Sequence, residues 1–156
     1  MKKNLKQILL CTIVLTTIFI VTGCTKKAIT ADNFKDEMEN ENYRVEDVTS
    51  QFSSSSYMKK AYVAINDNKN FQIEFFELKD DNSAISMYNT NKQKFENEKG
   101  NNSLNTNIDG KNYSKYVLVT NGKFQVVCRV NNTLLYLNIP SKYEKEAKNI
   151  IEKLGY

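Results

Sequence analysis

The spacing of hydrophobic side chains after residue 30 follows two different periods along the chain, and each period predicts a kind of element. Phe34 and Met38 lie four residues apart on one side of a predicted helix over residues 30–42. Apolar side chains at helical spacing predict two more helices, over residues 80–97 and 141–154. The third helix has the cleanest apolar stripe, so we expect it to pack firmly on the core of the domain.

Alternating or continuously apolar runs between these helices predict β-strands. Turn-forming residues separate neighbouring runs, and Asn121-Gly122 is the strongest hairpin signal because both residues tolerate a positive φ. The segment over residues 98–112 is rich in Asn, Gly and Ser, and we predict that it is the longest loop. The five predicted strands cover residues 60–66, 71–78, 113–120, 123–130 and 133–139.

The order of these elements is α-ββ-α-βββ-α, and the short turns between the strands favour antiparallel pairing. We therefore predict the α+β class, with an antiparallel sheet of about five strands and the helices packed on one face. Side chains alternate along the strand over residues 71–78. We expect Phe71, Ile73 and Phe75 to face the helices, and Gln72, Glu74 and Phe76 to face the other side.

The N-terminus has a different pattern, which is typical of a secretory signal peptide. Lys2, Lys3 and Lys6 precede a run over residues 8–21 that is apolar apart from its threonines, and small residues follow. This run is shorter than the roughly 20 apolar residues that span a bilayer comfortably. A signal peptide is therefore the favoured interpretation, and a permanent membrane-spanning helix is the alternative.

The residues Val21-Thr22-Gly23-Cys24 close this run and resemble the lipobox of bacterial lipoproteins, in which Leu is more usual at the first position. The resemblance implies that a diacylglycerol is attached to the thiol of Cys24 and that a signal peptidase cleaves between Gly23 and Cys24. Two acyl chains give a stable anchor, whereas one gives only reversible binding. The implied organisation is a signal peptide over residues 1–23, a lipidated tether over residues 24–30 and one extracytoplasmic domain over residues 31–156.

Removal of the signal peptide changes the charge of the chain. The count of Lys and Arg falls from 22 to 19 against 18 acidic residues, so the net charge falls from +4 to +1. Nucleic-acid binding usually needs a strongly basic domain, and we therefore expect no nucleic-acid partner. The chain has no histidine, which removes the commonest general base and metal ligand. We expect neither a cofactor nor a metal ion.

The cysteines leave no pair for a disulfide bond within the mature domain. Cys11 belongs to the predicted signal peptide and Cys24 carries the predicted lipid, so only Cys128 remains. Cys128 shares a predicted strand face with Phe124 and Val126, and no histidine is present to activate it. We therefore expect a buried structural thiol and not a nucleophile.

The acidic residues show no spacing that predicts an acid–base pair. Glu74 and Glu77 lie three apart in one predicted strand, so they face opposite sides of the sheet. Asp80 and Asp81 occupy a predicted helix start, where backbone donors explain carboxylates. We therefore predict that the protein is not an enzyme.

Aromatic and polar side chains are interleaved on the sheet face that we expect to lie opposite the helices. An exposed surface of this kind suits the docking of a ligand or a protein. The alternative is that the first helix or the loop over residues 98–112 covers it. The residues of this tentative binding surface are Tyr62, Glu74, Phe76, Tyr116 and Tyr136.

These features together predict a lipoprotein anchored on the extracytoplasmic face of the cell membrane. In size and in its Lys- and Asn-rich style, the chain is similar to small lipoproteins of low-GC Gram-positive bacteria. The functional hypothesis is a non-catalytic binding or accessory module at the cell envelope, held to the membrane through Cys24, with an envelope protein as a candidate partner. The alternatives are a small solute-binding lipoprotein and an envelope enzyme with an acidic site that the sequence pattern does not reveal.

Overall fold

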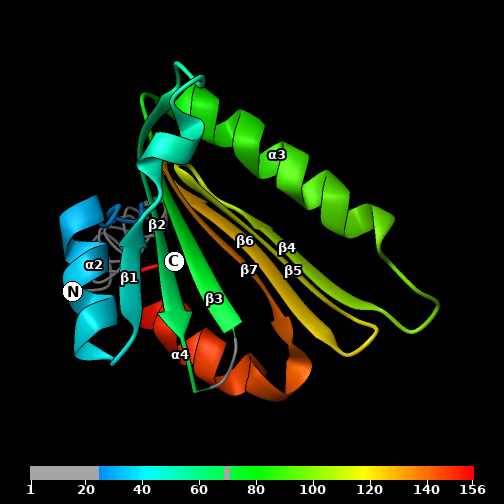
Figure 1. Ribbon diagram of the computed structural model, residues 1–156. Helices are drawn as coiled ribbons and strands as arrows, with labels where there is room; N and C mark the ends of the chain where they lie inside the picture. Colours follow the sequence, from blue (N-terminus) through cyan, green and yellow to red (C-terminus); the bar gives the residue numbers. More distant parts are fainter. Residues whose placement is uncertain (1–24, 69–70) are drawn as a thin grey trace, which may run out of the picture.

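The computed structural model describes residues 25–68 and 71–156 (Figure 1). The predicted signal peptide and the lipobox residues Gly23 and Cys24 lie outside the described residues, so their processing stays a prediction. A segment without regular secondary structure over residues 25–30 leads into the first described helix, α2 (Ala31–Asn40). Among the described helices, none is both long enough and apolar enough to cross a membrane.

An open antiparallel sheet of seven strands forms the centre of the part of the chain that the structure describes. Two meanders build it, β1-β2-β3 and β4-β5-β6-β7, and they meet where β3 pairs with β7. The order across the sheet is therefore β1-β2-β3-β7-β6-β5-β4. The strands are β1 (Arg44–Asp47), β2 (Met58–Asn66), β3 (Phe71–Leu78), β4 (Leu104–Asp109), β5 (Tyr113–Thr120), β6 (Lys123–Val130) and β7 (Thr133–Pro140).

The α+β class is confirmed, whereas the prediction of about five strands is too low. The two strands that were not predicted, β1 and β4, form the two edges of the sheet. An edge strand has one neighbour and buries little surface, so its apolar pattern is weak. All six residues of β4 are exposed. The segment over residues 98–112, predicted to be the longest loop, therefore contains a strand.

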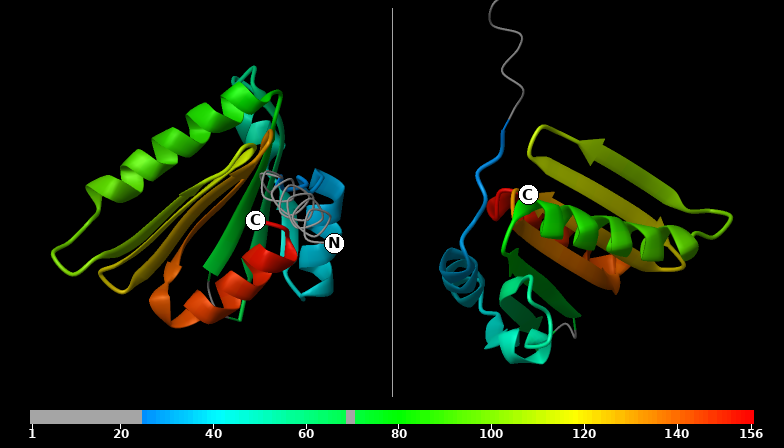
Figure 2. Two further views of the ribbon diagram at one scale, coloured as in Figure 1. Left: turned by 180° about the vertical axis from the view of Figure 1, so that it is seen from behind. Right: turned by 90° about the horizontal axis from the view of Figure 1, so that it is seen from above.

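Helices cover both faces of the sheet, which corrects the prediction that they pack on one face (Figures 1 and 2). Helices α2 and α4 (Glu144–Lys153) pack on one face, here called the two-helix face. Helix α3 (Asp81–Asn97) packs on the other, here called the α3 face. Because α3 leaves β3 at the centre of the sheet and leads to β4 at the far edge, it crosses over the second meander.

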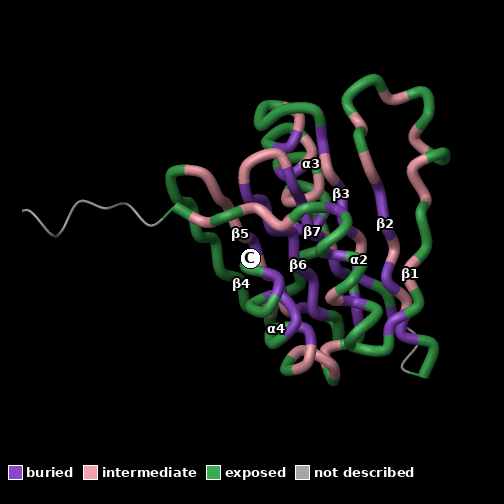
Figure 3. Tube along the Cα trace, turned by 90° about the vertical axis from the view of Figure 1, so that its left-hand side faces the viewer, coloured by how far each residue is buried: buried purple, intermediate pink, exposed green. Residues whose placement is uncertain are grey.

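Each face of the sheet has its own hydrophobic core, and Figure 3 shows that the inner strands hold many of the buried residues. On the two-helix face, Phe34 of α2 stacks on Phe75 with ring centroids 4.7 Å apart. On the α3 face, Tyr88 and Phe95 are buried between α3 and the strands. The internal strand β6 contributes to both cores, and every residue from Phe124 to Val130 is buried. Burial on both sides favours apolar residues, and among these seven residues only Gln125 and Arg129 are polar.

Short polar features set the ends of the elements that surround the α3 face. Asp80 caps α3 by accepting a hydrogen bond from the backbone N–H of Ser83 at 2.7 Å. Asn121 and Gly122 have φ values of 49° and 73°, which confirms the predicted tight turn between β5 and β6.

The side chain of Asn112 attaches the N-terminal segment to the sheet. It accepts a hydrogen bond from the backbone N–H of Lys26 at 3.0 Å and donates one to the Lys26 carbonyl at 2.7 Å. Its amide also donates to the side chain of Asn131 at 2.9 Å. The Asn112 side chain therefore bonds both backbone polar groups of Lys26, as the backbone of a paired strand would do. This holds the tether beside the start of β5.

Candidate functional site

Four of the five residues of the tentative binding surface share the α3 face. Glu74 and Tyr136 are direct cross-strand neighbours on β3 and β7, and Phe76 lies two residues further along β3. Tyr116 belongs to the same row of the sheet as Tyr136, with Val127 between them. The alternation of the strands therefore places these side chains on one side, as predicted.

The fifth residue, Tyr62, lies on the two-helix face, which corrects its assignment. In the register of β2 and β3, Tyr62 stands opposite Phe75 and not opposite Glu74. Its ring is buried beneath α2, with its centroid 6.5 Å from that of Phe34. Tyr62 is therefore a core residue and takes no part in a binding surface.

Tyr116 is on the α3 face but is covered. Its side chain is 1% exposed. Lys92 of α3 and Lys99 just after it place their ammonium groups over the ring, within 6 Å of its centroid. The cover here is α3 together with Lys99, which belongs to the segment predicted as the longest loop, whereas the first helix packs on the other face. Of the tentative binding surface, only Glu74 of β3 and Tyr136 of β7 are thus both on the α3 face and not fully buried.

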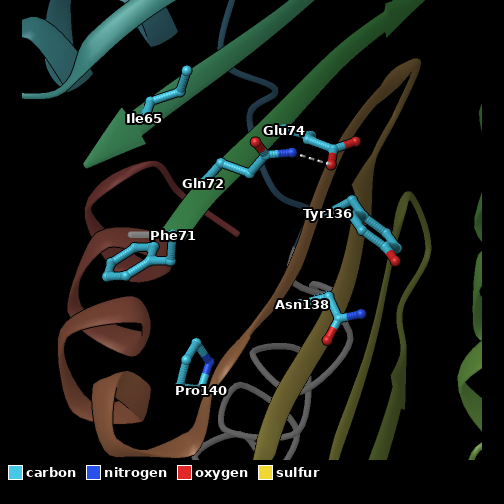
Figure 4. Close-up of a pocket in the computed structure, with 7 residues that line it drawn as sticks. All are labelled: Ile65, Phe71, Gln72, Glu74, Tyr136, Asn138 and Pro140. Atoms are coloured by element: carbon cyan, nitrogen blue, oxygen red, sulfur yellow. Dashed lines mark hydrogen bonds between the residues drawn. The ribbon is translucent and has the colours of Figure 1, made fainter. Parts of the chain in front are cut away.

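A groove runs along β3 and β7 at the place where α3 leaves the sheet uncovered. It consists of two hollows that share Glu74 and Tyr136 as lining residues, so these two side chains form the floor between them. The outer hollow has a volume of about 390 Å³ and is also lined by Gln72 and Asn138 (Figure 4). Its polar groups are two amides, a phenol and a carboxylate.

The inner hollow has a volume of about 300 Å³ and lies between the sheet and α3. Phe52 and Phe76 supply apolar walls and meet edge to face, with ring centroids 5.7 Å apart. Asn91 and Lys94 of α3 line its other side. The groove therefore changes from a polar outer end to an aromatic inner end that has one ammonium group on its wall.

Glu74 is the single carboxylate among the described residues that line the groove. It is half-buried and accepts a hydrogen bond from the side-chain amide of Gln72 at 3.0 Å. Every ion pair between described residues uses a different carboxylate. Burial raises the pKa of Glu74, and the Gln72 amide opposes this only in part. Glu74 is thus an acidic group held partly out of water, and residues 25–68 and 71–156 give it no cationic partner.

Tyr136 is positioned by α3. Its ring stacks on the buried ring of Phe95, with centroids 5.2 Å apart and an angle of 24° between the planes. Burial raises the pKa of Tyr136, and the neighbouring Glu74 charge raises it further. At neutral pH the phenol therefore keeps its proton and can donate a hydrogen bond into the groove.

Sequence reasoning missed Gln72, Asn138 and Lys94 as lining residues. Gln72 was predicted to share a side with Glu74, and Asn138 follows Tyr136 by two residues, so alternation alone could have added both. Lys94 gave no such signal, because the face on which α3 packs depends on the path of the chain across the sheet.

Cys128 lies on the two-helix face and is 1% exposed. It shares this face with Phe124 and Val126, so the prediction of a buried thiol is confirmed. Burial raises the pKa of its thiol to about 12, so the reactive thiolate is scarcely populated at neutral pH.

Among residues 25–68 and 71–156, no group of three or more Cys, Asp or Glu side chains is arranged to hold a metal ion.

No protein-family model, curated protein or solved structure matches this chain. The groove is therefore interpreted from its own residues. A negative group, a phenol, two amides and aromatic walls can bind a ligand that carries a positive charge and hydrogen-bonding groups.

Proposed function

We propose that this protein is a lipid-anchored extracytoplasmic binding module, and that its groove holds a positively charged group of the ligand against Glu74. The observation that carries the ligand assignment is the half-buried Glu74 carboxylate, which no cation of the described residues pairs with. The signal-peptide pattern and the lipobox at Val21-Thr22-Gly23-Cys24 support the location.

An unpaired carboxylate that is partly removed from water costs free energy in the unliganded protein. An ammonium or guanidinium group in contact with Glu74 supplies the missing charge and donates hydrogen bonds to it. The aromatic ring of Tyr136 beside the carboxylate adds a favourable site for a cation. The groove thus discriminates in favour of a cation over a neutral group of the same shape.

The distribution of charge within the groove orients the ligand. Lys94 lines only the inner hollow, and no basic side chain of the described residues lines the outer one. The cation therefore occupies the outer hollow, where Gln72 and Asn138 offer hydrogen bonds to the rest of the ligand. A volume of about 390 Å³ is of the size that small-molecule sites use.

The rival hypothesis of an envelope enzyme gains no support from this groove. Hydrolysis by paired acids needs a second carboxylate beside the first, and among the described residues only Glu74 supplies one here. A single carboxylate with amides and a phenol favours binding over catalysis.

The ligand assignment is tested by titrating ¹⁵N-labelled protein with n-butylammonium and, separately, with neutral n-butanol. We expect the cation to shift amide resonances of β3 and β7, and butanol to shift them far less. Glu74→Gln should weaken cation binding roughly 10- to 150-fold, which is the effect of losing a hydrogen bond to a charged group.

The matched control is Glu46→Gln. Glu46 lies on the same face and in the same row of the sheet as Glu74, but it pairs with Arg44 and lines neither hollow. This variant should bind the cation like the unchanged protein. Equal binding of butanol, or unchanged binding by Glu74→Gln, would overturn the ligand assignment.

The anchor is tested separately with Cys24→Ala. We expect the unchanged protein to fractionate with membranes, with a mass that includes a diacylglycerol, and the variant to lose both properties. A variant that still matures and fractionates with membranes would refute the lipobox interpretation.

A further inference from the structure

The β4–β5 hairpin carries apolar side chains that other described elements leave uncovered. Leu104 and Ile108 of β4 are 72% and 44% exposed, although both are large and apolar. They point to the two-helix face, because their cross-strand partners Val119 and Lys115 stand on that face. Val117 and Val119 on the neighbouring strand β5 share this face and are only half-buried. The residues of this hairpin surface are Leu104, Thr106, Ile108, Val117 and Val119.

The described chain begins at one end of the hairpin surface. Asn112, in the turn between β4 and β5, holds Lys26 by two hydrogen bonds. Lys26, Ile108 and Lys115 line one hollow of about 180 Å³. Cys24 precedes Lys26 by two residues. A lipid on Cys24 is therefore attached within two residues of the hollow that Ile108 lines, and the apolar strand leads away from this hollow towards Leu104.

Basic side chains gather at the same end. Burial lowers the pKa of Lys26 and the nearby charge of Lys115 lowers it further, and Lys111 is exposed in the turn between the strands. Glu152 of α4 is the carboxylate that faces Lys26. The nearest acid of the hairpin, Asp109, points to the α3 face, where it accepts a hydrogen bond from Asn107. The end of the surface nearest the anchor is therefore positive.

We propose that the hairpin surface lies against the outer leaflet of the membrane, with Leu104 and Ile108 at the boundary between headgroups and acyl chains. This inference rests on the lipid anchor proposed above. The span from Ile108 to Leu104 is about 13 Å at the rise of a β-strand. Apolar faces of this kind insert to a depth of about 5–10 Å, and adjacent lysines are attracted to anionic headgroups.

This orientation has a consequence for the groove. The hairpin surface belongs to the two-helix face and the groove to the α3 face, so the two lie on opposite sides of one sheet. The membrane contact therefore turns the groove around Glu74 away from the bilayer, where a ligand can reach it.

The test uses the full lipidated chain, which contains no tryptophan. Leu104→Trp places a single fluorescent reporter on the hairpin surface. Asn105→Trp is the matched control, because Asn105 is exposed on the same strand and points to the opposite face. Each variant is reconstituted into vesicles of equal parts phosphatidylglycerol and phosphatidylcholine, with bromine on the acyl chains as a contact quencher.

We expect bromine to reduce the emission of Trp at position 104 at least twofold and to leave that at position 105 nearly unchanged. A protein that floats with the vesicles but shows no quenching at position 104 would overturn the orientation and leave the anchor intact. The emission of Trp at position 104 could instead shift to the blue without quenching, and this shift could grow with protein concentration. That result would show that a second copy covers this surface, and it would equally overturn the inference. A chain that does not float with the vesicles would refute the anchor itself.

Discussion

Asn112 fastens the tether to the domain, and its substitution by Ala tests how the domain is held near its anchor. The Asn112 side chain makes two hydrogen bonds with the Lys26 backbone and one with Asn131. Asn112→Ala removes all three. Each partly buried hydrogen bond contributes about 1 kcal/mol net, so the loss of the two bonds with Lys26 should weaken the docking of residue 26 by about 2 kcal/mol.

Hydrogen exchange of the Lys26 amide measures this change directly. The amide is protected by its bond to Asn112 Oδ1, and a loss of 2 kcal/mol corresponds to roughly 30-fold faster exchange. Amides of α2 should change much less, because α2 is held by its own packing on the core through Phe34 and Met38. The matched control is Asn101→Ala, since Asn101 is exposed in the loop after α3.

An unchanged exchange rate at Lys26 in Asn112→Ala would refute the role of Asn112. The same variant also tests whether the docked tether determines which face of the sheet contacts the membrane. A freer tether should lower the quenching of Trp at position 104 in vesicles, because the anchor would then no longer fix which face of the sheet meets the bilayer.

Three further predictions concern the core and the groove. Phe95→Ala should lower the free energy of unfolding by about 3–5 kcal/mol in urea denaturation, because the ring is fully buried and supports Tyr136; a loss below about 1 kcal/mol would contradict this. Burial raises the pKa of Glu74 in the folded protein above its ordinary value of 4.5. The folded state therefore binds the proton more tightly than the unfolded state does, and stability falls as the pH rises from this ordinary value through the pKa of the folded state. Glu74→Gln should therefore unfold at a higher temperature than the unchanged protein at pH 7 and lose this pH dependence, and coincident profiles would count against the argument. Cys128 should react with a thiol reagent only as fast as the domain opens, because the thiol is buried and protonated; reaction at the rate of a free cysteine would disprove its burial.

The central strands were predictable because burial on both sides leaves a strong apolar signal. The strand predicted over residues 123–130 matches β6 in its bounds, and the strand predicted over residues 71–78 matches β3 in its bounds and in the alternation of its side chains. The edge strands β1 and β4 were missed because they bury almost nothing. In β4, Leu104 and Ile108 do alternate with polar residues, but the asparagines of the segment favoured a loop.

The candidate site was predictable in part. Glu74 and Tyr136 were placed on one face by alternation, whereas Tyr62 was assigned to the wrong face. The turn between Asn66 and Phe71 fixes the register, and counting back from it sets Tyr62 opposite Phe75. The contribution of Lys94 was not predictable, because an amphipathic pattern shows which side of a helix is apolar but not which face of the sheet it covers.

The pairing of β3 with β7 determines when the sheet can be completed. Every other pair in the sheet joins strands that are consecutive in the sequence, but β3 and β7 are separated by α3 and three strands. Closing so long a segment is entropically costly, and such non-local pairings form late. Since β7 follows all the other strands of this sheet, a polypeptide that emerges from the ribosome forms the hairpins of both meanders before it can join them. The strand β7 therefore closes the sheet at its centre, and completion of the sheet must wait until β7 has been made.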